Sequence, residues 1–313
     1  MYAKFIPAAS AALTLIIHAG VPNSAKYMHG KLPYLKILLL VILAATVISI
    51  ILSRFNPQFG EKYAYKSRFV GAALLFVCLY NVITVKLMLL PAIYFPAIDV
   101  ILRVFVEEWA FLLKCLAYSF RLLLIGFVLG ASTGIATGIM VGWSKQWSYW
   151  IHPLIRLIGP IPSTAWIPIA LVSFANSFQA SIFLIALAVW FPTTVLTSSG
   201  IYNVKNAYFE VASTLGANSF QKIFKIALPD AMPSIFVGIF NGTCASFLTL
   251  MTAEMMGVKF GIGWYINWQR EMMSYANVYA GLITIAVSFS FIITVMFKVR
   301  DKTLGWQKGI IKW

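Results

Sequence analysis

Long apolar stretches constrain the fold of this chain more than any other feature. A helix needs about 20 apolar residues to cross a hydrocarbon core of about 30 Å. By that rule the expected spans are Phe5–Val21, Tyr34–Leu52, Phe69–Tyr94, Leu122–Gly142, Ile158–Phe174, Phe178–Ile201, Ala231–Leu250 and Val278–Phe297. The first is short, so we expect seven spans, or eight if it also crosses. Since backbone polar groups inside a bilayer must pair within the chain, the pattern predicts an all-α polytopic membrane protein.

Composition supports a membrane protein and excludes several other classes. Of the 313 residues, 61% are hydrophobic and only 11% are charged, and the mean hydropathy is +0.86. We expect no cleavable leader, because no short apolar run near Met1 is followed by a polar mature chain. No cluster of His, Cys or carboxylate residues has the spacing of a metal or catalytic site, so we expect no metal, no catalytic residue and no enzymatic activity in this chain.

The net charge of +15 is better explained by membrane orientation than by nucleic-acid binding. With the C-terminus inside, 15 of the 24 Lys and Arg residues lie on the cytoplasmic side and 8 outside, with Lys86 left within a span. If the first stretch does not cross, the excess persists at 14 to 9. The distribution predicts a cytoplasmic C-terminus and a cytoplasmic segment at 205–229, and no nucleic-acid partner.

That segment is a half-polar island between two apolar spans, and it includes EVASTLGANSFQKIFKIALP at 210–229. Helical periodicity brings Val211, Leu215 and Phe220 near one another. Gly216 allows a sharp bend between two short helices, and Pro229 marks the start of the next span. We expect a short helix with a rigid link to the membrane, on which a cytoplasmic partner can push.

The island resembles the EAA loop of the permease subunits of bacterial ABC importers, whose pattern is EAA, three residues, G, nine residues, I-x-L-P. Six of seven specified positions match, and Val211 replaces the usual second Ala. In that family the loop docks on a cytoplasmic ATPase. The resemblance therefore implies a set of coupling residues: Glu210, Val211, Ala212, Leu215, Gly216, Ala217, Ile226, Leu228 and Pro229.

Two further segments resemble the nitrate, sulfonate, taurine and bicarbonate branch of these permeases: RLIGPIPSTAWIPIALVSF at 156–174 and TAEMMGVKFGIGWYI at 252–266. Gly159 and Asn176 depart from residues frequent in that branch. The resemblance implies a type I ABC importer permease fold over 68–300, containing the EAA loop at 205–229. It leaves 1–67 as an N-terminal extension with one or two extra spans and 301–313 as a basic cytoplasmic tail.

The family implies partners that this chain needs in order to work. These are a second copy of the permease, two cytoplasmic ATPase subunits that bind ATP and Mg, and an external solute-binding protein, assembled in the lipid of the bacterial inner membrane. The chain lacks G-x-x-x-x-G-K-[ST], so we expect it to hold no nucleotide itself. The branch favours a small anion as solute, but thiamine-precursor and riboflavin importers share these features, so the solute stays open.

Polar groups within spans are candidates for lining a solute route, because they are costly against lipid. Asn241 and Thr249 share one helical face, and Thr194 lies in the preceding span; interhelical hydrogen bonding is the alternative for such residues. Lys86 either contacts an anion or extends to the interface. Pro160, Pro162 and Pro168 are expected to form a hinge or a kink.

Two other features give expectations that a structure can test. The segment from Pro96 to Arg121 alternates apolar and charged residues, which predicts an amphipathic helix on the outer interface. Glu254, near the outer end of its span, is expected to pair with a backbone amide or a basic group. The nine acidic residues lie in loops or at span ends, which argues against the rival reading of an ATP-independent secondary carrier.

Overall fold

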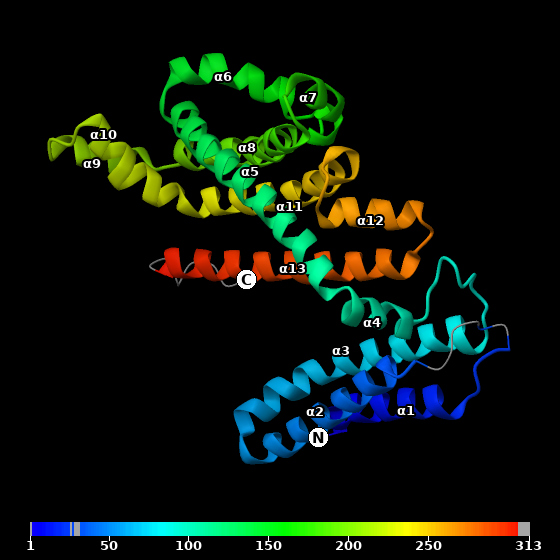
Figure 1. Ribbon diagram of the computed structural model, residues 1–313. Coiled ribbons are helices and arrows are strands. Elements are labelled where there is room, and N and C mark those ends of the chain that lie inside the picture. The colour runs from blue at the N-terminus through cyan, green and yellow to red at the C-terminus, as the bar shows by residue number, and fades with distance from the viewer. Residues whose placement is uncertain (1, 26, 28–31, 306–313) are drawn as a thin grey trace. The chain divides into compact units, whose positions relative to one another are not determined.

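The computed structural model describes residues 2–25, 27 and 32–305, and every regular element in them is a helix (Figure 1). The helices are η1 Tyr2–Phe5, α1 Ile6–Gly20, α2 Tyr34–Phe55, α3 Pro57–Asn81, η2 Val82–Lys86, α4 Ile98–Glu107, α5 Trp109–Trp143, α6 Lys145–Ile158, η3 Ser163–Trp166, α7 Ile167–Ser173, α8 Ser177–Tyr202, α9 Asn206–Thr214, α10 Ser219–Lys222, η4 Ile223–Ala227, α11 Leu228–Gly257, α12 Ile262–Glu271 and α13 Tyr275–Thr303. The all-α expectation is confirmed.

Seven helical stretches among the described residues are long and apolar enough to cross a membrane. One of them is Ala3–Gly20, so the short first stretch qualifies. An eighth is counted if α6 and the η3–α7 segment together form one span. The expectation of seven or eight spans is therefore confirmed by length and composition.

The stretch expected as a continuous span at Ile158–Phe174 is broken instead. Its two helical parts, Lys145–Ile158 and Ser163–Ser173, meet at 87°. The break falls at Gly159–Pro162, where two prolines lack the N–H that continues a helix. Pro168 lies in the first turn of α7, where a missing N–H costs nothing. The bend is therefore formed at Pro160 and Pro162, and Pro168 only begins the next helix.

The amphipathic segment is shorter than the expected range from Pro96 to Arg121. It ends at Glu107 as α4, and the 35-residue helix α5 begins at Trp109, well before the expected Leu122. Asp99 of α4 is buried, and its Oδ1 accepts the N–H of Leu35 at 2.8 Å. Hydropathy alone misplaced the start of α5, because Lys114 and Arg121 interrupt the apolar sequence of its first turns without interrupting the helix.

The chain divides into two compact units, each described separately below. The first unit comprises 1–110 and 268–280. Its core joins α1, α2 and α3 through Ala11, Leu35, Leu39 and Leu74. The expected domain boundary at 67/68 lies within α3, which packs on both preceding helices.

Lys86 is buried in this first unit at the end of α1. Its ammonium donates to the carbonyl oxygens of His18 and Val21 and, at 2.8 Å, to Asn23 Oδ1. These carbonyls belong to the C-terminal turn of α1, where helix geometry leaves acceptors unpaired and a cation is favoured. Lys86 thus stabilises the end of α1, which is a different role from either one expected of it.

The second unit comprises 111–267 and 281–313, of which 306–313, most of the expected basic tail, lie outside the described residues. Glycines recur every fourth residue along α5 at 126, 130, 134, 138 and 142, and each faces α8. A Cβ at Gly130 would lie 2.5 Å from the carbonyl oxygen of Ala186. Such close backbone approach is how small residues hold membrane helices together without a hydrophobic driving force.

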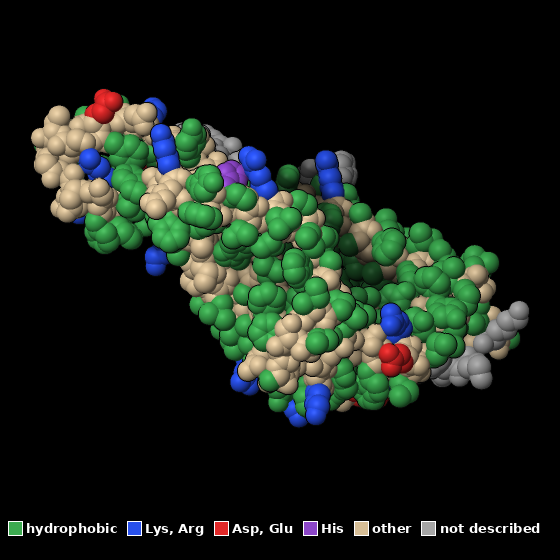
Figure 2. All heavy atoms as spheres, turned by 90° about the horizontal axis from the view of Figure 1, so that it is seen from above, with side chains coloured by type: hydrophobic (Ala, Val, Ile, Leu, Met, Phe, Trp, Pro, Cys, Tyr) green, Lys and Arg blue, Asp and Glu red, His purple; other side chains and the backbone are tan. Residues whose placement is uncertain are grey.

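The surface is apolar over much of the face seen in Figure 2 and turns polar and basic where α9 and α10 lie. Large apolar side chains such as Ile48 on α2 and Phe291 on α13 are more than half exposed. Exposed apolar area on this scale is stable only against lipid or another apolar surface.

Candidate functional site

The polar island folds as two short helices joined by a tight turn. Gly216 follows α9 with φ +77°, a conformation that favours glycine. The N–H of Ala217 donates to the carbonyl of Ala212 at 2.9 Å, and the N–H of Gly216 donates to that of Ser213 at 3.0 Å. This pair of bonds is the Schellman motif, which satisfies the last carbonyls of α9 and turns the chain sharply.

A second cap begins the next helix two residues later. Asn218 Oδ1 accepts the N–H of Gln221 at 2.8 Å, and Gln221 Oε1 accepts the N–H of Asn218 at 3.0 Å. This capping box pairs two donors that α10 would otherwise leave open. The two helices α9 and α10, with the turn between them, form an elbow. From α10 the chain passes through η4 directly into α11, so this elbow is continuous with a membrane-spanning helix.

The elbow presents apolar side chains to its surroundings. Val211, Leu215 and Phe220 are 60%, 81% and 67% exposed, while Glu210 beside them is also exposed. Ala212, in contrast, is buried. An apolar surface with a charged rim on an otherwise basic, polar segment is typical of a protein interaction site.

Contacts on the buried side tie the elbow to the membrane helices. The Phe209 ring meets the Trp143 ring at the end of α5, with 5.5 Å between centroids. Phe209 also packs on a cluster that includes Ile201 of α8 and Ala231 of α11. Phe209 therefore connects α9 to α5, α8 and α11 by direct packing.

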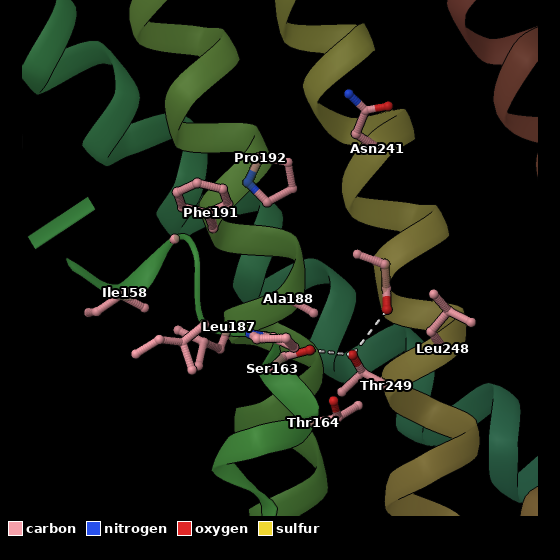
Figure 3. A pocket seen from close by; sticks show the side chains of 14 residues that line it. Ile158, Ser163, Thr164, Leu187, Ala188, Phe191, Pro192, Asn241, Leu248 and Thr249 are labelled. Atoms are coloured by element: carbon pink, nitrogen blue, oxygen red, sulfur yellow. Dashed lines mark hydrogen bonds between the residues drawn. The ribbon is translucent and has the colours of Figure 1, made fainter. Parts of the chain in front are cut away.

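Two of these helices, α8 and α11, border a hollow of about 360 Å³ (Figure 3). One wall is the break between α6 and α7, from Ile158 to Thr164. The other walls are the middle of α8, around Ala188 and Phe191, and the middle of α11, from Asn241 to Thr249. No charged side chain lines it among the described residues.

One hydrogen bond closes one side of this hollow. Ser163 Oγ lies 2.6 Å from Thr249 Oγ1 and joins the η3 segment to α11 (Figure 3). Thr249 Oγ1 also lies 3.0 Å from the carbonyl of Ala245, to which it donates. Because a hydroxyl has one proton, Ser163 then donates to Thr249.

The predicted path residues separate into three groups. Asn241 and Thr249 line the hollow together. Thr194 does not line it; its hydroxyl pairs with that of Thr137 at 2.8 Å between α8 and α5, which is the interhelical bonding named as the alternative. Lys86 belongs to the first unit and bonds the end of α1.

Sequence reasoning missed Ser163, Phe191 and the Trp143–Phe209 contact. Ser163 directly follows the prolines expected to form a hinge or a kink, but its contact with Thr249, 86 positions along the chain, has no local signal. Phe191 occupies the space beside Gly159, where a Cβ would come within 2.1 Å of its ring. A side chain at 159 would therefore collide with this ring unless Phe191 moved.

The chain matches the model of the family described as "Binding-protein-dependent transport system inner membrane component" over residues 115–301. It is 33% identical over 185 residues to a Bacillus subtilis strain 168 protein described as an aliphatic sulfonates transport permease, covering 59% of this chain and 67% of that one. It is 32% identical over 190 residues to the bicarbonate transport system permease protein of Synechococcus elongatus, covering 60% and 65%. These matches confirm the resemblance to that branch.

The fold is shared with a solved structure. The inward facing MetNI methionine ABC transporter aligns with a TM-score of 0.52 and 16% identity, covering 63% of this chain and 98% of the aligned chain. The expected importer permease fold is confirmed by this likeness.

Proposed function

Because the chain belongs to the binding-protein-dependent transport system inner membrane component family, we propose that it is the permease subunit of an ATP-driven importer. It forms the solute path and couples to two cytoplasmic ATPase subunits through the elbow of α9 and α10. The complete importer contains a second permease copy and an external solute-binding protein. ATP and Mg bind in the ATPase subunits, and the C-terminus of this chain is cytoplasmic.

The observation that carries this proposal is the two-sided elbow. On one side Val211, Leu215 and Phe220 are open to a partner. On the other side Phe209 packs on the cluster that includes Ile201 of α8 and Ala231 of α11, two helices that line the hollow. An ATPase that binds the open side and moves therefore acts on the hollow through packed side chains.

The test is co-purification of the ATPase with the tagged chain in detergent. Glu210→Arg reverses the charge beside the apolar surface, and Gly216→Pro removes the turn, since proline fixes φ near −65°. Glu61→Arg, at an exposed glutamate on α3, is the matched control. We expect the wild type and the control to retain the ATPase and the two elbow variants to lose it. A wild-type chain that retains no ATPase would overturn the proposal.

For the solute we propose a small oxyanion of the nitrate, sulfonate, taurine or bicarbonate type. The support is the chemistry that the names of the relatives print, sulfonates and bicarbonate. The test is uptake by cells that carry the complete importer, with the labelled anions offered separately. Uptake of a thiamine precursor or riboflavin in place of every anion would contradict this assignment.

A further inference from the structure

The second unit contains another hollow, of about 330 Å³, at the end of α5, α8 and α11 that is remote from the elbow. Trp143 of α5 and Ile201 of α8 lie beside the elbow cluster. The hollow instead lies at the opposite ends of these helices: Tyr118 and Arg121 of α5, residues 176–178 at the start of α8, and 257–260 after α11.

Aromatic contacts fix the walls of this second hollow, called the outer hollow below. The guanidinium carbon of Arg121 lies 5.2 Å from the centroid of the Phe178 ring. The Phe260 ring stacks on Tyr118 of α5 with 5.1 Å between centroids. The ammonium of Lys114, also on α5, lies 5.2 Å from the centroid of the Phe260 ring. Cations over aromatic faces are attracted by the quadrupole of the ring, which holds these side chains against the walls.

The loop that carries Lys259 is anchored on both sides. At its far end, the N–H of Gly263 donates to Glu254 Oε2 at 2.8 Å, which confirms the expected pairing of Glu254 with a backbone amide. Gly261 has φ +142°, and a Cβ there would lie 2.4 Å from the Glu254 carboxyl carbon. The buried carboxyl thus determines where the loop lies, and Phe260 anchors it to α5.

The charge of the outer hollow differs from that of the central hollow, the 360 Å³ space beside Ser163 and Thr249. Arg121 and Lys259 both line it, and its described lining contains no acidic side chain. Tyr118, Phe178 and Phe260 supply apolar faces beside these two cations. Arginine binds planar oxyanions through paired N–H donors, whereas lysine acts as a point charge.

We propose that the outer hollow binds the oxyanion group of a small molecule, a sulfonate, carboxylate or phosphate. Arg121 and Lys259 contact the oxygens, and the aromatic rings contact the organic part. Two sources carry this chemistry, a dissolved solute and a phospholipid headgroup. With a dissolved solute, the inference rests on the proposed function and makes the hollow a staging site on the outer side.

The two hollows suit successive steps of passage. Ten residue positions separate Phe178 from Ala188 along α8, which is about 15 Å at 1.5 Å per residue. Paired cations in a cleft raise the local concentration of an anion. The central hollow has no charged lining, so it holds the anion only weakly. Transport requires both properties, because the anion must bind well enough to enter and weakly enough to leave.

The test compares the wild type with Arg121→Gln, Lys259→Gln and the double variant in the complete importer. Arg103→Gln, at a half-buried arginine on α4 whose Nε lies 3.6 Å from Glu107 Oε2, is the control. We expect the double variant to raise the KM for labelled taurine or bicarbonate about tenfold, at the lower end of what charged clefts contribute, with kcat retained. The variant that combines Arg121→Lys with Lys259→Arg keeps both positive charges, so we expect its KM to stay close to that of the wild type. Higher salt should raise the wild-type KM, because it screens these charges.

A second arm identifies the source of the anion. The tagged chain is placed in nanodiscs of phosphatidylcholine with phosphatidylglycerol, and retained lipid is measured by native mass spectrometry. Loss of phosphatidylglycerol in the double variant, with an unchanged KM, assigns the hollow to lipid. Unchanged KM and unchanged lipid overturn the inference, even when ATPase co-purification upholds the proposed function. Absence of the ATPase overturns the proposed function alone, because lipid retention is still measurable.

Discussion

The ring of Phe209 in α9 meets the ring of Trp143 at the end of α5 edge-on, with the ring planes at 78°. The two residues belong to different helices and are far apart in the sequence. Their contact joins the elbow to α5, whose glycines face α8, and α8 is one wall of the central hollow. Under the proposed function, coupling between the cytoplasmic side and the path passes through this contact.

Phe209→Ala should separate ATPase binding from transport. Loss of an aromatic pair removes about 0.5–1.5 kcal/mol beyond area burial, while the exposed surface of Val211, Leu215 and Phe220 is untouched. We expect the ATPase to co-purify as in the wild type, with uptake per ATP hydrolysed reduced several-fold. Phe240→Ala, which breaks the Phe240–Phe297 stack at 5.3 Å instead, is the control. Equal losses in the two variants would contradict a specific role for Phe209.

Gly216→Ala should weaken the elbow although there is space for the methyl group. No atom lies within 4 Å of a Cβ built at Gly216, so the cost comes from φ +77°, about 1–2 kcal/mol for a residue with a side chain. We expect weaker ATPase retention, partly restored by Gly216→Asn because asparagine tolerates this conformation.

Gly20→Ala is the matched control for that substitution. Its Cβ also meets nothing within 4 Å, and its φ is not positive. Binding of the ATPase is measured by titration of the purified chain in detergent. The explanation from backbone conformation would be wrong if alanine at 216 bound as tightly as glycine.

Asp99 should make stability depend on pH. Burial raises the pKa of Asp99 above its ordinary value of 3.8, although the Leu35 N–H, His18 of α1 and Lys86 of η2 each lower it. The folded chain therefore holds this proton more tightly than the unfolded chain, and the associated stability is present below 3.8 and is lost as pH rises through the higher folded pKa.

The measurement is thermal unfolding in detergent as a function of pH. Asp99→Asn keeps an acceptor for the Leu35 N–H but carries no charge, so we expect it to gain stability relative to the wild type as pH rises above 4. The exposed Asp230→Asn on α11 should show no such crossover. A gap between wild type and Asp99→Asn that stays constant with pH would exclude this role for the Asp99 proton.

Local signals were sufficient to predict much of this structure. The spans follow from runs of apolar residues, and the elbow at Gly216 follows from helix periodicity and glycine chemistry. Asn241 and Thr249 share a hollow because spacing along one helix fixes a common face.

Contacts between distant residues were not predictable in the same way. Lys86 lies 65 positions from Val21 along the chain, and Trp143 meets Phe209 only after α5, α8 and α9 have packed. At Gly159–Pro162 hydropathy alone indicates one span, because apolar residues flank the break, and the prolines predicted a hinge or kink there without its angle of 87°. Thr194 was assigned to the path by polarity, whereas the glycines of α5 bring Thr137 within its reach.

The hydrogen bond between Ser163 and Thr249 offers a test of movement at the break. With 2.6 Å between the hydroxyl oxygens, a cysteine at each position has its sulfur close to disulfide-bonding distance. The pair is made after Cys78, Cys115 and Cys244 are replaced by alanine. If the η3 segment moves relative to α11 during transport, oxidation should arrest uptake and a reducing agent should restore it.

Thr137 and Thr194 provide the matched cysteine pair. Their hydroxyl oxygens are 2.8 Å apart, but they join α5 to α8, which the glycines at 130, 134 and 138 already hold in close backbone contact. Since that interface is packed too tightly to slide, we expect cross-linking there to leave uptake unchanged. Uptake that continues with the 163–249 disulfide formed would show that the break is a rigid kink, because a hinge at Pro160 and Pro162 requires that contact to open.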